Sequence, residues 1–321
     1  MVHKVFSSGT DLVRVQNLDK VIPVSRSREL IDAFLELIKI RITFFVGMSS
    51  IFGGVLAASV ISPKILEACT GIFLLSCASA AMNHYQERNT DGLMRRTMNR
   101  PLPSGILQPH SVLVIIGFLS LAGSVLILLF GNIMALFLSW LAFFSYNLIY
   151  TPLKKITPFA VIPGSFVGAF PVMAGWSAAL EPAARITGLI NPAILVIASF
   201  FFIWQMPHFW LLMDIYNADY KRGGFPTLRS YFTGKATDIF TFSWIVLLVV
   251  TSLFFQAAGV VNSIMVQLII VAFGIWLISG SYSIIMKSGD NRTEKSAFMK
   301  INVYVLAVTL VIMVDKLINI I

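Results

Sequence analysis

The stretch VLVIIGFLSLAGSVLILLF, residues 112–130, contains no charged side chain and is long enough to cross a lipid bilayer. About 20 mostly apolar residues in an α-helix match the thickness of the hydrocarbon core. Leu, Ile, Val and Phe fill the stretch without the apolar–polar alternation that a transmembrane β-strand requires. The stretch therefore predicts one transmembrane α-helix.

Eight further segments are also long enough to cross the bilayer and predominantly apolar. They cover residues 42–62, 65–84, 133–151, 158–180, 190–212, 239–259, 262–285 and 299–318. The composition agrees, because 57% of the 321 residues are hydrophobic, only 12% are charged, and the mean hydropathy is +0.83. A soluble domain carries far more charge. We therefore predict an all-α integral membrane protein with nine transmembrane helices.

Basic residues lie almost entirely on one side of the nine predicted spans. Of the 24 Lys and Arg residues, 21 fall on that side, and the exceptions are Lys64, Arg185 and Lys316. Positively charged loops stay cytoplasmic in membrane proteins. We therefore expect a cytoplasmic N-terminus in a bacterial inner membrane, with the matrix side of a mitochondrial inner membrane as the less favoured setting. This asymmetry and contact with anionic membrane lipid account for the net charge of +9 without a nucleic-acid partner.

Residues 1–35 are predicted to form a polar cytoplasmic arm, and residues 36–321 to form the transmembrane domain. The arm lacks the apolar stretch and small-residue cleavage site of a secretory signal. Its acids Asp11 and Asp19 are unusual for a transit peptide. A short helix at the membrane interface is expected near residues 28–36.

The segment AMNHYQERNTDGLMRRTMNRPLPSG, residues 81–105, places charge where the second span ends. Asn83, Glu87 and Asp91 are spaced four apart, so they share one face of a helix. Oxygen ligands without sulfur suit a hard cation such as Mg²⁺, which keeps positions for water and substrate phosphate. A solvated helix end with local ion pairs is the alternative interpretation.

Four arginines follow or accompany this acidic face. They are Arg88, Arg95, Arg96 and Arg100. Guanidinium groups bind phosphate oxygens in pairs. Carboxylates and guanidinium groups on one helix end together indicate a magnesium-bound diphosphate, whereas the arginines alone would only indicate a cytoplasmic loop.

A second polar cluster follows the sixth span and includes His208, Asp214, Asp219, Tyr220 and Lys221. Asp214 lies about 140° round a helix from Asp219, so we interpret it as a solvated helix end. His208 stands among aromatic residues that suit a porphyrin. A hydrogen bond from His208 to a neighbouring helix is the alternative.

These motifs resemble the intramembrane prenyltransferases of the UbiA type, and within them the protoheme IX farnesyltransferases (heme O synthases). The family's first motif is Asn, three residues, Asp, three residues, Asp, a basic run and NRPLPSG. This chain has the whole of NRPLPSG at residues 99–105 and departs from the motif at Glu87, where Asp is usual. MPHFW at 206–210 and DYKRGGFPTL at 219–228 resemble the second motif of the heme branch. LELIKIRITFF, with its Lys-x-Arg pair, resembles the family's entry to the first span, and the likeness covers about residues 36–316.

The resemblance implies nine helices around a central cavity and assigns roles to particular residues. The catalytic residues, which would also bind Mg²⁺, are Asn83, Glu87, Asp91 and Asp219. Diphosphate would be bound by Arg88, Arg95, Arg96, Arg100, Lys154 and Lys221. Heme would be contacted by His208 and Tyr220. The implied reaction transfers the farnesyl group of farnesyl diphosphate to a vinyl group of protoheme IX (heme B), with addition of water, to give heme O. The product would pass to a heme A synthase or a terminal oxidase assembly.

Two other functions stay open at this point. One is prenylation of an aromatic or chlorin acceptor on the same fold, and the choice of heme rests on the PHFW and DY residues with the single acid at Asp219. The other is transport. A transporter would scatter charge near the bilayer midplane, whereas these acids gather at one side beside arginines.

Overall fold

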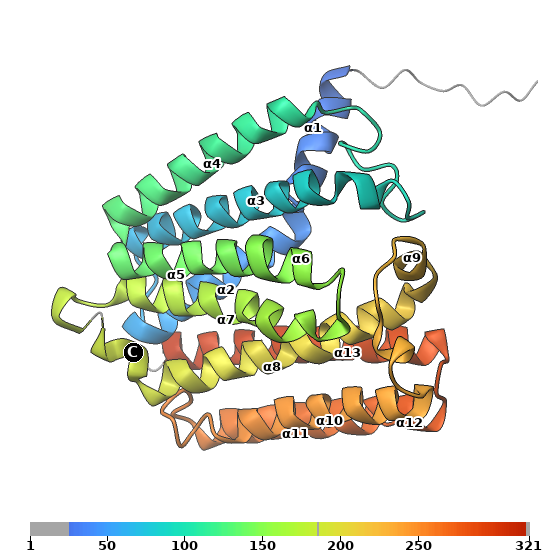
Figure 1. Ribbon diagram of the computed structural model, residues 1–321. Coiled ribbons are helices and arrows are strands. Elements are labelled where there is room, and N and C mark those ends of the chain that lie inside the picture. The colour runs from blue at the N-terminus through green and yellow to red at the C-terminus, as the bar shows by residue number, and fades with distance from the viewer. Residues whose placement is uncertain (1–25, 185, 319–321) are drawn as a thin grey trace, which may run out of the picture.

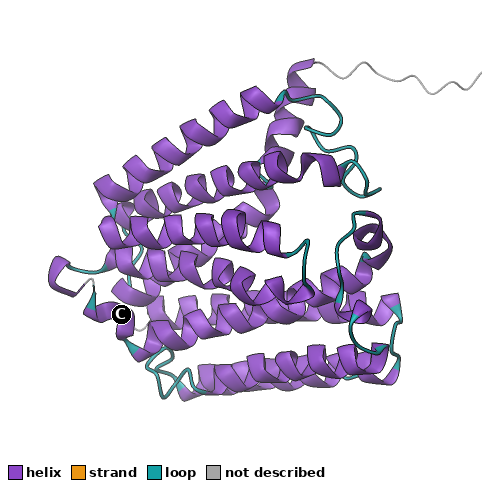
Figure 2. Ribbon diagram, viewed as in Figure 1, coloured by secondary structure: helices purple, strands orange, loops and turns teal. Residues whose placement is uncertain are grey.

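The computed structural model describes residues 26–184 and 186–318, and within these ranges the protein is a bundle of helices without strands (Figures 1 and 2). The α-helices are α1 (Arg26–Leu37), α2 (Ile40–Ala58), α3 (Pro63–Asp91), α4 (Pro109–Phe130), α5 (Ile133–Phe144), α6 (Thr151–Leu153), α7 (Val161–Ala179), α8 (Pro192–Ile215), α9 (Asn217–Arg222), α10 (Gly234–Leu253), α11 (Ile264–Ser281), α12 (Ser283–Met286) and α13 (Asn291–Ile318). A π-helix, Ser145–Tyr150, joins α5 to α6.

The nine predicted transmembrane segments are confirmed. Within the described ranges, nine helical stretches are long and apolar enough to cross a membrane. The fourth runs from Ile133 to Leu153 through the π-helix, and the eighth joins α11 to α12. Many large apolar side chains point outward, Phe118 with 70% of its surface exposed. Such a surface suits lipid rather than water, and the protein is an integral membrane protein.

Several helices extend beyond the predicted apolar segments, α3 and α13 by the most. Helix α3 continues past residue 84 to Asp91, and α13 begins at Asn291 rather than near residue 299. Polar turns continue each apolar helix beyond the hydrocarbon, and hydropathy alone underestimates such helices. The extension of α3 carries the acidic face (Asn83, Glu87 and Asp91).

Helix α7 lies between the two halves of the bundle (Figure 1). Its Ala174 and Ala178 pack with buried residues of α3 and α5, whereas its Val172 and Trp176 pack with those of α8, α10 and α13. The crossing with α2 is close: a Cβ at Gly53 would lie 2.0 Å from the carbonyl oxygen of Val172. Small residues at such crossings let helix backbones approach, so α2 and α7 form a fixed centre for the bundle.

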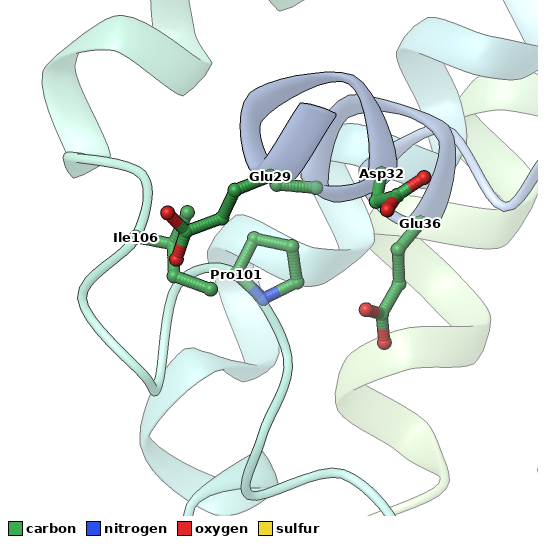
Figure 3. A pocket seen from close by; sticks show the side chains of 6 residues that line it. Glu29, Asp32, Glu36, Pro101 and Ile106 are labelled. Atoms are coloured by element: carbon green, nitrogen blue, oxygen red, sulfur yellow. The ribbon is translucent and has the colours of Figure 1, made fainter. Parts of the chain in front are cut away.

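Helix α1 lies against α2 and α3, so the helix expected near residues 28–36 is present. Its buried Leu37 packs with Ala81 and Val112. A surface hollow between α1 and the 101–106 loop is lined by Glu29, Asp32, Ala33, Glu36, Pro101 and Ile106 (Figure 3). The rest of the predicted arm, residues 1–25, lies outside the described residues, and the boundary at residue 35 stays a prediction.

Candidate active site

The two polar segments predicted to form the site meet at one end of the bundle, where α3 ends and α9 lies (Figure 1). The guanidinium of Arg96 lies 4.8 Å from the ring centroid of Tyr216. A Cβ at Gly223 would lie 3.1 Å from the sulfur of Met94. The loop after α3 therefore contacts the segment after α8.

The acidic face of α3 is buried. The exposed fractions of Asn83, Glu87 and Asp91 are 0%, 4% and 1%. A buried carboxylate is unfavourable unless it is paired and hydrogen-bonded. The alternative of a solvated helix end is therefore wrong for these residues.

Each oxygen ligand of the acidic face pairs with a different cation. The Nζ of Lys39 donates to Asn83 Oδ1 at 2.5 Å, and the Nζ of Lys154 lies 2.6 Å from Glu87 Oε1. Arg100 Nη1 donates to both carboxylate oxygens of Asp91, at 2.9 and 2.8 Å. Three cations thus face two carboxylates and one amide. The surplus positive charge suits an anionic ligand such as diphosphate.

Lys39 is a candidate site residue that the sequence analysis assigned no role. It stands between α1 and α2 in the left-handed region, with φ 50°, which a non-glycine residue rarely adopts. Burial lowers the pKa of Lys39 to about 7, Arg100 acts in the same direction, and Glu87 opposes them. The Lys-x-Arg pair before the first span was the signal that could have identified it.

The donor set fits Mg²⁺. Asn83, Glu87 and Asp91 supply hard oxygen ligands from one helix face, and the facing segment supplies Asp219. Asp219 Oδ1 is buried without a hydrogen bond within the described residues, and its nearest cation, Arg222 Nη2, lies 3.4 Å away. An under-coordinated carboxylate oxygen is a suitable ligand for a cation.

Tyr220 follows Asp219 and lies within electrostatic range of α3. Burial raises the pKa of the Tyr220 phenol, Glu87 and Asp91 act in the same direction, and Arg96 opposes them. The ring of Tyr220 also packs against Phe225, with 5.8 Å between centroids. The charges of the acidic face thus act on the Tyr220 phenol, and the contact of Tyr220 with heme stays a prediction.

An aromatic row borders the acidic face. The rings of Tyr146 and Tyr150 stack with 5.6 Å between centroids, and Tyr150 lies 5.3 Å from Phe209. Lys154 Nζ lies 5.3 Å from the Tyr150 ring centroid. A Cβ at Gly164 would lie 2.6 Å from the Tyr150 ring, so a side chain larger than that of glycine at this position would clash with the ring. Apolar rings thus begin where the charged groups end.

His208 lies on α8 next to this row. Its Nδ1 is 2.9 Å from Asn302 Oδ1 on α13, and its ring centroid is 4.9 Å from that of Trp204 and 4.8 Å from that of Phe298. The predicted hydrogen bond to a neighbouring helix is present. Contact with heme stays a prediction.

The other predicted diphosphate ligands surround the site less closely. Arg88 turns back over its own helix, donating to the carbonyl oxygen of Tyr85 at 2.6 Å with its guanidinium 4.5 Å from that ring. Arg95 and Lys221 are exposed. Arg100 and Lys154 are the two predicted cations that contact the acidic face directly.

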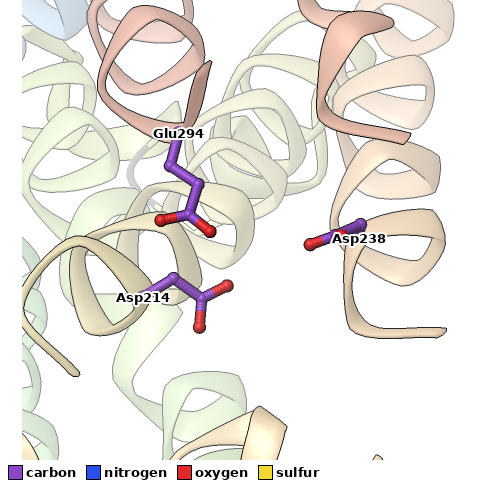
Figure 4. Close-up of side chains that lie close together, drawn as sticks. All are labelled: Asp214, Asp238 and Glu294. Atoms are coloured by element: carbon purple, nitrogen blue, oxygen red, sulfur yellow. The ribbon is translucent and has the colours of Figure 1, made fainter. Parts of the chain in front are cut away.

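Asp214 is not a solvated helix end, contrary to the prediction. It is buried, and its carboxylate lies close to those of Asp238 and Glu294 (Figure 4). Arg229 contacts all three: Nε is 3.2 Å from Asp214, and Nη2 is 2.7 Å from Asp238 and 2.8 Å from Glu294. Burial alone would lower the pKa of Arg229, but the three carboxylates raise it. We name these four residues the Arg229 network; it joins α8, α10 and α13 beside the second polar segment.

Known proteins similar to this chain share the region that contains both polar segments. The sequence matches the UbiA prenyltransferase family over residues 43–304. A protoheme IX farnesyltransferase of Christiangramia forsetii is 32% identical over 302 residues, covering 91% of this chain and 96% of the relative. Another, of Cytophaga hutchinsonii, is 34% identical over 217 residues, covering 66% of this chain and 73% of the relative.

Solved structures show the same fold. One described for digeranylgeranylglyceryl phosphate synthase has a TM-score of 0.70 at 17% identity and covers 90% of this chain and 99% of its own. A UbiA homolog from Archaeoglobus fulgidus bound to GPP and Mg²⁺ has a TM-score of 0.62 at 13% identity, covering 87% and 99%. Because the family match includes both polar segments and most of the nine spans, the chain belongs to the UbiA prenyltransferase family.

Proposed function

We propose that this protein transfers the farnesyl group of farnesyl diphosphate to a vinyl group of protoheme IX and that water adds to give heme O. The observation that carries the proposal is the buried acidic face of α3, whose members each pair with a cation directly beside an aromatic row. The curated relatives named protoheme IX farnesyltransferase support the choice of substrates. The A. fulgidus homolog, bound to GPP and Mg²⁺, supports a prenyl diphosphate and a divalent cation.

The acidic face and the cations would exchange partners when the substrate binds. Asn83, Glu87, Asp91 and Asp219 would hold Mg²⁺, which when bound neutralises charge on the diphosphate leaving group. Lys39, Lys154 and Arg100 are then released to donate to diphosphate oxygens, and Arg88, Arg95, Arg96 and Lys221 extend the basic surface around them. Charge that develops as the C–O bond breaks is thus met by fixed donors.

The aromatic row would receive the farnesyl carbocation. Rings of Tyr146, Tyr150 and Phe209 stabilise a cation through their π-systems and keep water from it. Diphosphate leaves as this carbocation forms, and carbon C1 of the farnesyl group then bonds to the terminal vinyl carbon of heme. Water adds to the other vinyl carbon and releases one proton. His208 and Tyr220 are the proposed heme contacts beside this row.

We place the site at the cytoplasmic face of a bacterial inner membrane, with a cytoplasmic N-terminus. The distribution of basic residues on one side of the spans supports this orientation. The product, an apolar heme held in the membrane, is suited to direct transfer to a heme A synthase or a terminal oxidase assembly.

The test is heme O formation in membranes that contain this chain, supplied with heme B and farnesyl diphosphate and analysed by mass spectrometry. We expect product with wild-type protein, none after EDTA, and restoration by Mg²⁺. Asp91→Asn and Asp219→Asn should each lower turnover at least 100-fold with normal membrane insertion, because each removes an ionised ligand. The matched control is Asp32→Asn, an exposed acid on α1. Prenylation of an aromatic or chlorin acceptor, with heme unchanged, would refute the choice of heme.

A further inference from the structure

The hydrogen bond between α8 and α13 determines which nitrogen of His208 carries the proton. Asn302 Nδ2 donates to the carbonyl oxygen of Phe298 at 2.7 Å. A carbonyl oxygen only accepts, so the amide must present its nitrogen to Phe298 and its oxygen to His208. An amide oxygen also only accepts, and it lies 2.9 Å from His208 Nδ1. The proton of neutral His208 is therefore on Nδ1, which leaves a free lone pair on Nε2.

Aromatic side chains hold the ring in this orientation. Trp204 packs on His208 at 4.9 Å and Phe298 at 4.8 Å between centroids, while Phe209 meets it edge-on at 5.7 Å. Phe298 and Asn302 lie one turn apart on α13, so one face of α13 fixes both the ring and its tautomer. The ring is held from both helices.

The polar groups around the ring lack partners among the described residues. His208 is half-buried, and its Nε2 makes no hydrogen bond to residues 26–184 or 186–318. Trp204, one turn earlier on α8, buries its indole Nε1–H without an acceptor in the part of the chain that the structure describes. Among the described residues, the lone pair of His208 Nε2 and the N–H of Trp204 thus lie in neighbouring side chains with no protein partner, so both are available to a ligand with a polar or metallic centre.

We propose that Asn302 is a positioning residue that presents Nε2 of His208 as an axial ligand to the iron of the heme substrate. Histidines that bind metals through one ring nitrogen characteristically donate the other N–H to an oxygen acceptor, and the Asn302 oxygen supplies that acceptor. The inference rests on the proposed function, because heme is the acceptor there. It adds a residue on α13, outside both polar segments.

Purified protein in detergent, titrated with heme B, tests the proposal through the absorption spectrum of the heme. Wild type should give the spectrum of a histidine-ligated heme. Asn302→Leu, which keeps the volume and removes the acceptor, should weaken heme binding by about 10–100-fold and shift the spectrum. It should raise the KM for heme with little change in the KM for farnesyl diphosphate. Asn302→Asp, which keeps an oxygen acceptor, should retain the ligated spectrum.

The matched control is Thr309→Val on α13, whose hydroxyl donates to the carbonyl oxygen of Val305 in its own helix. A double-mutant cycle supplies the decisive comparison, because Asn302→Leu should have no further effect on heme binding in the His208→Ala background. A wild-type spectrum and an unchanged KM for heme in folded Asn302→Leu would overturn the proposal. If that variant does not fold, loss of the ligated spectrum in Asn302→Asp would overturn it.

Failure of this inference is distinguishable from failure of the proposed function. Wild-type protein that binds heme through His208 but forms no heme O would refute the reaction and leave the role of Asn302 standing. Heme O formation that Asn302→Leu leaves unchanged would refute only the role of Asn302. Wild-type protein that binds no heme would refute both.

Discussion

Replacement of Arg229 by methionine is expected to be among the most destabilising single changes in the protein. The guanidinium is the cation at the centre of three carboxylates, with N–O distances of 3.2, 2.7 and 2.8 Å. Asp214, Asp238 and Glu294 are all buried, so the variant leaves three mutually repelling acids with little access to water. Removing one partner of a buried ion pair costs about 3–5 kcal/mol. We expect Arg229→Met to lower the free energy of unfolding by at least that amount.

A second substitution separates charge from packing. If unpaired carboxylates cause the loss, Asp238→Asn added to Arg229→Met should recover part of the stability, although it alters a second buried side chain. Arg229→Lys keeps one charge but cannot contact three carboxylates, so it should fall between wild type and Arg229→Met. Thermal or denaturant unfolding in detergent micelles, followed by tryptophan fluorescence, gives the comparison. Stability of Arg229→Met within about 0.5 kcal/mol of wild type, the range of ordinary surface substitutions, would refute this account of the Arg229 network.

Three further substitutions address other parts of the site and the fold. Lys39→Met removes a charge-assisted hydrogen bond worth about 1.5–3 kcal/mol, so kcat/KM for farnesyl diphosphate should fall by about 10–100-fold. The control Arg41→Met should have little effect. Equal kinetics in the two variants would contradict a role for Lys39. Tyr150→Phe should keep most activity, whereas Tyr150→Leu should lower kcat by about tenfold, because a ring over a cation contributes about 1–2 kcal/mol. Equal rates in the two variants would argue against stabilisation of the carbocation by the aromatic row. Gly53→Ala places a methyl group 2.0 Å from the Val172 carbonyl oxygen and should destabilise the bundle by about 1–3 kcal/mol. The measurement is the midpoint of unfolding, which should be lower in the variant. An unchanged midpoint would show that α2 and α7 can separate freely.

The features that sequence analysis predicted are local in the chain. A transmembrane span depends on some twenty consecutive residues, and the acidic face depends on a four-residue spacing, so both follow from length and helical period. Contacts between distant elements do not follow in this way. Lys39 is 44 residues from Asn83, and His208 is 94 residues from Asn302. Neither pairing leaves a periodic signal.

Asp214 shows the limit of arguing from one helix at a time. Its angular offset from Asp219 assumes one continuous helix, whereas α8 ends at Ile215 and α9 begins at Asn217. The offset also says nothing about what lies opposite Asp214. Asp238 and Glu294 come from α10 and α13, and Arg229 comes from the segment before α10. Only the packed bundle brings these residues to Asp214, so its burial was not accessible from the α8 pattern.

The π-helix at Ser145–Tyr150 sets the direction in which the following residues face. A π-turn holds one residue more than an α-turn, so it rotates everything after it by about 100° relative to a continuous α-helix. Thr151 and Lys154 follow it directly and reach Asn83 and Glu87. Deleting the lipid-facing Leu148, which is 62% exposed, would restore regular winding and turn both side chains away from α3. The site can thus be dismantled by shortening the backbone by one residue while every functional side chain remains.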